Sequence, residues 1–231
     1  MFSPSAQRFA VSSRVNSGFD PYAFAYKGPK RTWNVGRSAR LLALSAVVAV
    51  TTVVAGARPA ESANAFMAPL KTIAPPAGFG GVCDRYAWVC AKSSQNQKNL
   101  TDSEIIAIAR QVNRSVNARV RDVSDLQQYK QLEHWALPTR MGGDCEDFAL
   151  QKKRDLIARG VAPDRLLIAT ALTPQSVAHA VLILRTAGGD LVLDNRHRAI
   201  KPWQETEYSY LRMQNPKAPN RWQVVLAGGM F

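Results

Sequence analysis

The chain has 231 residues, of which 46% are hydrophobic and 20% charged, so it is long enough for one domain of ordinary size with additional segments. It carries 30 Lys and Arg residues against 17 Asp and Glu, a net charge of +13, but residues 1–65 alone hold eight of the bases and only two of the acids. Because no basic helix or aromatic RNA-binding motif accompanies the remaining charge, we expect a mildly basic domain without a nucleic-acid partner.

An apolar stretch without charges covers residues 41–57, and several arginines precede it. An A-x-A pattern follows at residues 63–65, which makes Phe66 the candidate first residue of a mature chain. A charged region, an apolar segment and a small-residue cleavage site together are typical of a secretory signal peptide. The alternatives are a core helix, which the absence of a polar face disfavours, and an uncleaved membrane anchor, for which the length is only just sufficient. A membrane is therefore expected as a partner only through this segment.

These features divide the chain into three parts. Residues 1–40 are basic, show no periodicity and are predicted to be disordered. Residues 41–65 form the apolar region and the cleavage site of the signal peptide, and residues 66–231 form the mature domain.

The use of cysteine agrees with export. Cys83 and Cys90 flank six residues, and a disulfide can close so short a loop if the geometry permits. A metal-binding pair is the weaker interpretation, because no second Cys or His pair stands at zinc spacing. Cys145 is then the odd cysteine, which is typical of a reactive thiol.

The first half of the mature domain contains one strong helix signal. Residues 66–99 are rich in Pro and Gly and predict an irregular lead-in. Thr101 and Glu104 then form a capping box, and apolar residues at helical spacing follow, so residues 102–121 are predicted to be an amphipathic helix. Residues 122–141 are mixed, and four of them are expected to pack over a site further along the chain: Tyr129, Leu132, Trp135 and Leu137.

The most informative stretch is residues 142–147. Gly142 and Gly143 permit a tight or positive-φ backbone, and Cys145 begins a predicted helix over residues 145–159 that Gly160 closes. A helix N-terminus favours a thiolate. The three acids around the thiol oppose a thiolate unless a cation offsets them; they are Asp144, Glu146 and Asp147.

The sequence of the second half of the domain predicts β-strands. Periodicity and a Gly-Gly turn at residues 187–190 predict strands at residues 165–172, 177–185, 191–194 and 222–226. Helices followed by sequential antiparallel strands predict an α+β domain.

A three-residue constellation spans these elements. His179 interrupts an apolar strand, and Asp194 ends the next strand of the same hairpin. Strands of a hairpin lie about 5 Å apart, so the two side chains can be neighbours, and a helix that abuts the sheet can place Cys145 beside His179. The set would then act as a triad, in which an imidazolium stabilises the thiolate and a carboxylate orients the imidazole.

Each member of the triad has an ordinary explanation when it is taken alone. A buried Cys is more often inert packing, a His in a strand is more often a satisfied core residue, and an Asp before an Asn is usually a turn. Their occurrence together, in this order, reverses that preference. The rival histidines, His134 and His197, do not lie inside an apolar strand.

The chain resembles the bacterial transglutaminase-like cysteine proteinases, the LapG-type periplasmic proteases, over about residues 75–226. The matching positions are the block of residues 143–149, then Lys153, Leu156 and Gly160, the His179 block to residue 182, residues 193–195, and Pro202 with Trp203; Asn113, Asn117, Trp135 and the Cys83/Cys90 pair also fit.

The resemblance implies a papain-like, transglutaminase-like α+β fold, with the nucleophile at the N-terminus of a helix packed on an antiparallel sheet. It makes Cys145 the nucleophile, His179 the general base and acid, and Asp194 the residue that orients His179. It also implies a periplasmic enzyme that requires calcium, with Asp144 and Glu146 as metal-ligating residues. Calcium takes six to eight oxygen ligands and would neutralise the acids near the thiol. The alternative is that these acids only favour the helix dipole, and Asp147 could cap the helix or supply a further ligand.

The expected function is an exported cysteine endopeptidase. The partners that the resemblance implies are a protein substrate, such as a large surface adhesin, and an inner-membrane receptor. Two alternatives remain: a transglutaminase-type acyl transferase, which uses the same triad, and a non-catalytic calcium-binding periplasmic protein, which would not need all three triad residues.

Overall fold

The computed structural model describes residues 65–93 and 98–230. The basic region 1–40 and the expected signal peptide, apart from Ala65, lie outside the described residues. Within the two described ranges, no helix has both the length and the apolar character needed to cross a bilayer.

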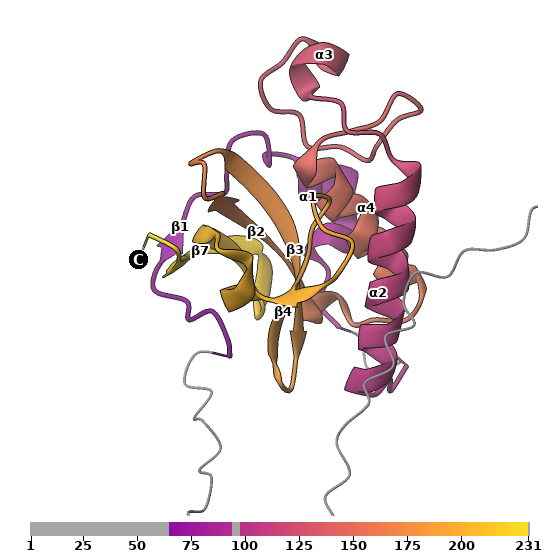
Figure 1. Ribbon diagram of the computed structural model, residues 1–231, viewed down its shortest axis with the longest axis vertical. Helices are drawn as coiled ribbons and strands as arrows, with labels where there is room; N and C mark the ends of the chain where they lie inside the picture. Colours follow the sequence, from indigo (N-terminus) through magenta and orange to yellow (C-terminus); the bar gives the residue numbers. More distant parts are fainter. Residues whose placement is uncertain (1–64, 94–97, 231) are drawn as a thin grey trace, which may run out of the picture. The chain divides into compact units, whose positions relative to one another are not determined.

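The domain combines helices with a single antiparallel sheet (Figure 1). In the described part of the chain, seven strands form this sheet in the order β1-β7-β6-β2-β3-β4-β5. The strands are β1 (Thr72–Ile73), β2 (Leu166–Leu172), β3 (Ala178–Thr186), β4 (Gly189–Leu193), β5 (Lys201–Pro202), β6 (Ser209–Asn215) and β7 (Ala218–Gly228). The helices are α1 (Val82–Arg85), α2 (Asp102–Arg119), α3 (Asp125–Tyr129) and α4 (Cys145–Ala158), with 3-10 turns at η1 (Ala87–Cys90), η2 (Pro163–Arg165) and η3 (Trp203–Thr206).

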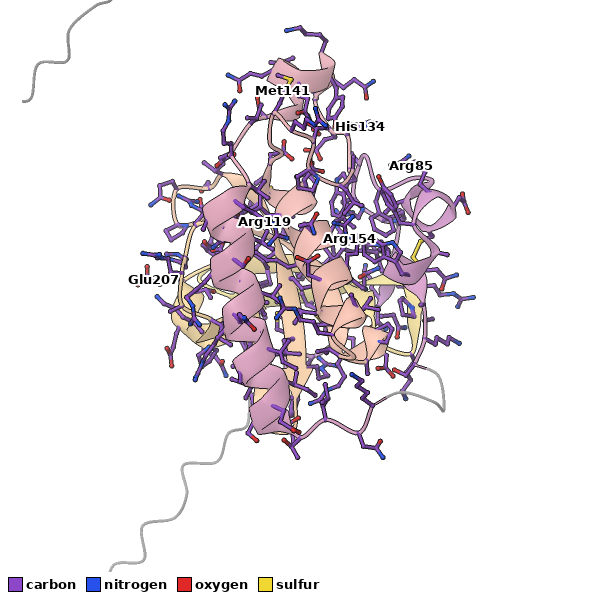
Figure 2. The ribbon with its side chains drawn as sticks, turned by 90° about the vertical axis from the view of Figure 1, so that its right-hand side faces the viewer. Arg85, Arg119, His134, Met141, Arg154 and Glu207 are labelled. Carbon is purple, nitrogen blue, oxygen red and sulfur yellow. A yellow bond between two sulfur atoms is a disulfide. The ribbon has the colours of Figure 1, made fainter. Side chains whose placement is uncertain are left out.

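The two long helices, α2 and α4, lie side by side against the sheet (Figure 2). Apolar residues of both helices and of β2 and β3 share one buried cluster, which also holds Trp135 and Trp222. A second cluster, which includes Met67, Trp203 and Tyr210, buries the alternate residues of β2, β3 and β4. The sheet is therefore apolar on both faces, which explains the nearly continuous apolar runs of β2 and β3.

The predicted helices and hairpin are confirmed. Thr101 and Glu104 make the reciprocal capping box at the start of α2, and α4 begins at Cys145. The turn between β3 and β4 falls where the Gly-Gly pair predicts it, with Thr186 paired to Gly189. The strand at residues 222–226 is longer than expected, since β7 spans Ala218–Gly228.

Sequence patterns did not reveal β6, which pairs with β2 on one side and β7 on the other. Its register shifts against both neighbours, so that buried and exposed residues do not alternate strictly along it. Such β-bulges add a residue to one strand of a pair and break the two-residue period.

The early cysteines are joined in the structure. Cys83 of α1 and Cys90 of η1 form a disulfide with a Cα–Cα distance of 5.6 Å, inside the normal range for such bonds. Cys145 is the free cysteine of the chain.

Gly142 has the positive φ that the sequence suggested, at 133°. A Cβ at this position would lie 2.2 Å from the backbone oxygen of Arg121, so no other residue fits without a backbone shift. Gly143 donates a backbone hydrogen bond to the same oxygen at 3.1 Å. This contact fixes the chain directly before Cys145.

Two hydrogen bonds with Asp190 anchor the start of the described chain, at Ala65 and Met67, to the domain. The backbone N–H of Asp190 donates to the carbonyl of Ala65 at 2.9 Å, and its buried carboxylate accepts from the N–H of Met67 at 2.9 Å. Arg185 forms a bidentate ion pair with the same carboxylate, and Met67 is only 1% exposed. Residues from Ala65 onward are therefore integral to the fold.

Lys153 is a buried cation in the middle of α4. It is fully buried, and its Nζ donates to Oε1 of Gln214 at 3.1 Å. Gln214 in turn accepts from the N–H of Ile168 and donates to the carbonyl of Pro219. Burial lowers the pKa of Lys153 to about 7, because a charge is disfavoured in a dry interior.

We expect the Lys153→Met variant to be more stable than the wild type by about 1–4 kcal/mol at pH 6. The lysine pKa is lower in the folded state than in the unfolded state. Between about pH 7 and pH 10 the unfolded wild type therefore binds more protons, and its stability rises with pH. The gap between variant and wild type should be full below pH 7 and shrink as the pH rises. Urea unfolding at several pH values measures it, with Arg154→Met on the exposed face of α4 as the control. A stability difference between variant and wild type that does not change with pH would contradict the lowered pKa of Lys153.

Candidate active site

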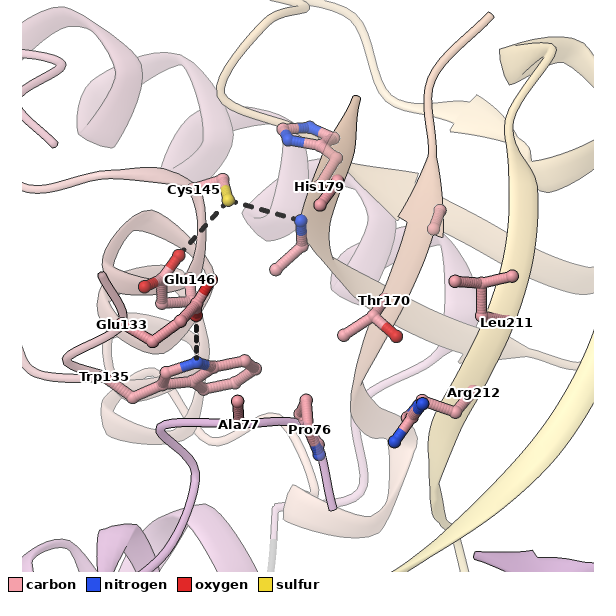
Figure 3. A pocket seen from close by; sticks show the side chains of 13 residues that line it. Pro76, Ala77, Glu133, Trp135, Cys145, Glu146, Thr170, His179, Leu211 and Arg212 are labelled. Atoms are coloured by element: carbon pink, nitrogen blue, oxygen red, sulfur yellow. Dashed lines mark hydrogen bonds between the residues drawn. The ribbon is translucent and has the colours of Figure 1, made fainter. Parts of the chain in front are cut away.

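Cys145 is the first residue of α4, and its thiol is held between an acid and a backbone amide (Figure 3). The Sγ–H donates to Oε2 of Glu146 at 3.2 Å. The N–H of Ala180 on β3 donates to Sγ at 3.3 Å. Burial and the charge of Glu146 raise the pKa of the Cys145 thiol well above its usual range. The helix N-terminus alone therefore does not produce a thiolate here.

His179 and Asp194 form a buried pair. Nε2 of His179 lies 2.9 Å from Oδ1 of Asp194, and both side chains are almost completely buried. Leu193 of β4 pairs with Leu182 of β3, so Asp194 lies just beyond the last paired position and reaches His179 diagonally across the hairpin.

The carboxylate of Asp194 is strongly stabilised in its charged form. Its Oδ1 also accepts from the N–H of Arg196 at 2.9 Å, and its Oδ2 accepts from the Tyr208 hydroxyl at 2.6 Å. Burial alone would raise the pKa of Asp194, but the hydrogen bond and charge of His179, together with the hydroxyl of Tyr208, lower it to about 2. Asp194 is therefore ionised at every pH at which the fold would be expected to function.

The structure brings Cys145 and His179 into one cleft. Because Nε2 of His179 faces Asp194, Nδ1 is the ring nitrogen left for proton exchange with the thiol. Over the described ranges, the hydrogen bonds of the thiol go to Glu146 and Ala180 and none joins it to the imidazole ring. If the thiol proton pointed toward Nδ1 of His179 instead of Glu146, Cys145, His179 and Asp194 would form one hydrogen-bonded chain.

The cleft beside Cys145 has a volume of about 220 Å³. Its walls come from the lead-in segment, the loop before α4, the start of α4 and strands β2, β3 and β6, and they combine small apolar side chains with polar and charged ones (Figure 3). Glu133 and Glu146 line it near the cysteine, and Arg212 lines it on β6.

Helix α2 holds the loop that follows Asp194. Nδ2 of Asn117 donates to the carbonyls of Asp194 and His197 at 2.8 and 3.0 Å. Nδ2 of Asn113 donates to the carbonyls of His197 and Arg198 at 2.9 and 3.1 Å. The side-chain amides of Asn113 and Asn117, one helical turn apart, therefore hold the backbone at and after Asp194 in place.

The residues on either side of Cys145 in sequence, Asp144 and Glu146, belong to an acidic cluster. Asp125, Asp144 and Glu146 each offer an oxygen, and these oxygens lie within 4.8 Å of one another. Burial and then the charge of Asp144 raise the pKa of Glu146 to about 9, and burial raises the pKa of Asp144. Three carboxyl groups this close repel one another when ionised, so the cluster is incomplete without a cation or protons.

Glu146 and His179 line the same cleft as Cys145, Asp194 contacts His179, and Asp144 lies beside Glu146. Two residues that the sequence did not indicate join them. Asp125 joins Asp144 and Glu146 although it is 19 residues from Asp144 in sequence. Tyr208 joins the His179–Asp194 pair from a loop that showed no functional signal. Asp147 accepts from the N–H of Ala136 at 2.8 Å and so anchors the loop before α4.

Other expectations around the site have mixed outcomes. Trp135 is buried and lines the cleft, as expected. Leu132 is 84% exposed, so the expectation that it packs over the site is wrong; it lies in the loop that follows α3, where no element covers it. His197 is partly exposed, and its Nε2 lies 3.9 Å from Oδ2 of Asp194. The ring of His134 lies against that of Tyr129.

The chain is similar to a known protein family and to solved structures. The sequence model of the family described as bacterial transglutaminase-like cysteine proteinase matches residues 70–229. Among solved structures, calcium-bound LapG of Legionella pneumophila is 24% identical with a TM-score of 0.46, over 56% of this chain and 74% of that chain.

A second structure of the same protein, treated with EGTA, is 24% identical with a TM-score of 0.42, over 50% of this chain and 66% of that chain. No curated protein sequence matches the chain. The family match covers most of the chain and the helix-on-sheet architecture agrees with it, so the chain belongs to the bacterial transglutaminase-like cysteine proteinases and is a cysteine peptidase of the transglutaminase-like type.

Proposed function

We propose that the chain is an exported, calcium-dependent cysteine endopeptidase with Cys145, His179 and Asp194 as its triad. The observation that carries the proposal is the buried His179–Asp194 pair beside a cysteine at a helix N-terminus. Ala180, the neighbour of His179, already donates to the cysteine Sγ at 3.3 Å. Nucleophile, base and orienting carboxylate are thus held by three different elements around one cleft.

The proposed reaction follows from these positions. Nδ1 of His179 takes the thiol proton, and Sγ of Cys145 attacks the scissile carbonyl carbon. His179 then returns the proton to the leaving amine as the C–N bond breaks, which leaves an acyl-enzyme. Water, deprotonated by His179, attacks the thioester, and the acid is released as the thiol is regenerated. Asp194 keeps the ring oriented and stabilises the imidazolium in both steps.

The acidic cluster fits calcium. The ligands are all carboxylate oxygens, which Ca²⁺ prefers. Within the described residues, Oδ1 of Asp125 and Oδ1 of Asp144 are buried and accept no hydrogen bond, and such orphaned oxygens are costly unless a ligand satisfies them. We infer that Asp125, Asp144 and Glu146 hold the ion. A bound cation would neutralise the acids beside the thiol, and it would draw Oε2 of Glu146 away from the thiol proton.

We extend the proposal to location and partners. A disulfide between Cys83 and Cys90 is typical of oxidising compartments such as the periplasm. The expected signal peptide over residues 41–65 would deliver the domain there. On the basis of the family resemblance, we propose that the substrate is a large surface adhesin or another periplasmic protein, and that an inner-membrane receptor holds the enzyme.

Labelling with a peptidyl acyloxymethyl ketone, which alkylates activated thiols, tests the enzymatic part of the proposal. The full chain in calcium chloride should be labelled at Cys145, and labelling should disappear in Cys145→Ala and His179→Ala. Labelling that survives in His179→Ala would exclude the imidazole as the activating base.

A further inference from the structure

Tyr208 is placed where it contacts both partners of the buried pair. Its hydroxyl donates to Oδ2 of Asp194 at 2.6 Å. Its ring meets the ring of His179 edge to face, with centroids 5.5 Å apart and an angle of 76° between the planes. One side chain therefore limits the motion of the carboxylate and of the imidazole at the same time.

The backbone holds Tyr208 firmly in this position. It follows Glu207, which has a positive φ of 61°, and directly precedes β6. The N–H of Gly229 donates to its carbonyl at 3.2 Å. A Cβ on Gly228 would lie 2.1 Å from the same carbonyl, so β7 approaches Tyr208 more closely than any other residue at that position would allow.

The hydroxyl completes the hydrogen bonding of a buried anion. Asp194 is 2% exposed, so water cannot replace a missing donor easily. Oδ1 of Asp194 is shared between His179 and the N–H of Arg196, while the hydrogen bond that holds Oδ2 comes from Tyr208. Without the hydroxyl, the carboxylate could rotate about its Cβ–Cγ bond and loosen its contact with Nε2 of His179.

We propose that Tyr208 is a positioning residue of the peptidase, which acts on Cys145 only through Asp194 and His179. The inference rests on the triad that we propose for this enzyme. Tyr208 lines a separate polar hollow with Arg196 and His197 and not the cleft beside Cys145. It should therefore affect the chemical step and not the binding of substrate.

The test is the rate at which iodoacetamide alkylates the full chain in calcium chloride at pH 6.5, followed by intact mass. Cys145 is the free cysteine, and an unactivated thiol is only about 1% thiolate at this pH. We expect Tyr208→Phe to react about tenfold more slowly than the wild type. In peptide cleavage, kcat should fall by a similar factor while KM stays constant.

A matched control and a double-mutant cycle separate positioning from packing. Tyr210→Phe removes a buried hydroxyl from β6, the strand that follows Tyr208, and this hydroxyl lies 3.0 Å from that of Thr206; the variant should react like the wild type. In an Asp194→Ala background, Tyr208→Phe should cause no further loss, because the residue through which it acts is absent.

Two results would overturn the inference while the proposed function stands: Tyr208→Phe with the wild-type rate, or an equal loss with and without Asp194. If wild type and His179→Ala are alkylated equally slowly, both the triad and the role of Tyr208 are wrong. Thermal unfolding of each variant confirms that the rates belong to folded protein.

Discussion

The Cys145→Ala variant should lose all measurable peptidase activity, a fall in kcat/KM of about 10⁴-fold or more. The variant removes the nucleophile, so only residual binding effects remain. The thiol is 3.3 Å from the N–H of Ala180, and alanine leaves this backbone in place. The fold should therefore be retained, and thermal unfolding should show a stable domain.

His179→Ala should lose activity by about 10³-fold or more, because Cys145 then has no base. The matched control is His197→Ala, which removes a partly exposed imidazole 3.9 Å from Oδ2 of the same Asp194 and should change kcat/KM less than about twofold. A quenched fluorescent peptide library with calcium chloride measures all of these rates. Equal losses in the two histidine variants would show that the pair was assigned wrongly.

Removal of calcium should give the second large effect. Chelation with EGTA should lower activity by about tenfold or more, because the thiol is then left beside three carboxyl groups without a cation. By calorimetry, Asp125→Asn, Asp144→Asn and Glu146→Gln should each weaken Ca²⁺ binding by about tenfold or more. Asp122→Asn changes an exposed acid in the segment that leads into α3, and this variant should bind calcium like the wild type. Asp125→Asn is the most informative of these variants, because Asp125 is placed in the cluster by the structure and not by the sequence.

The calcium affinity should also depend on pH in a defined direction. Without metal, the pKa of Glu146 is raised to about 9, whereas a bound ion requires the ionised form. Binding below pH 9 must therefore release a proton, and the affinity should fall by about tenfold for each pH unit that the pH is lowered. Calorimetry in two buffers with different ionisation enthalpies detects the proton. Binding without proton release would contradict the protonation of Glu146 in the metal-free protein.

The three residues of the proposed triad could be singled out from the sequence because each lies in or next to an element with a clear local pattern. Cys145 lies at the start of a helix just after two glycines, His179 interrupts an apolar strand, and the Gly-Gly turn places Asp194 diagonally opposite His179. The physical reason is that helix starts and two-residue hairpins are determined by residues within a few positions.

The remaining parts of the site depend on contacts between distant segments. Asp125 reaches the acidic cluster because its backbone N–H donates a hydrogen bond to Oδ2 of Asp144 at 3.1 Å, across 19 residues of sequence. Tyr208 meets Asp194 because β6 pairs with β2 rather than with the strand before it in sequence. Neither contact has a fixed spacing that a single sequence could reveal, and β6 itself is obscured by its bulges.

The hydrogen bond between the carbonyl of Ala65 and the N–H of Asp190 restricts access to the chain at Ala65. A protease that cuts after Ala65 needs this segment in an extended form, free of the domain. In the folded domain, Ala65 is tied to the β3–β4 turn, and Met67 is buried two residues later. If the signal peptide that we propose is cut after Ala65, the cut must therefore precede closure of the N-terminal segment on the sheet. A chain that folds first would then resist cleavage at this position, so the timing of folding would control the proposed processing.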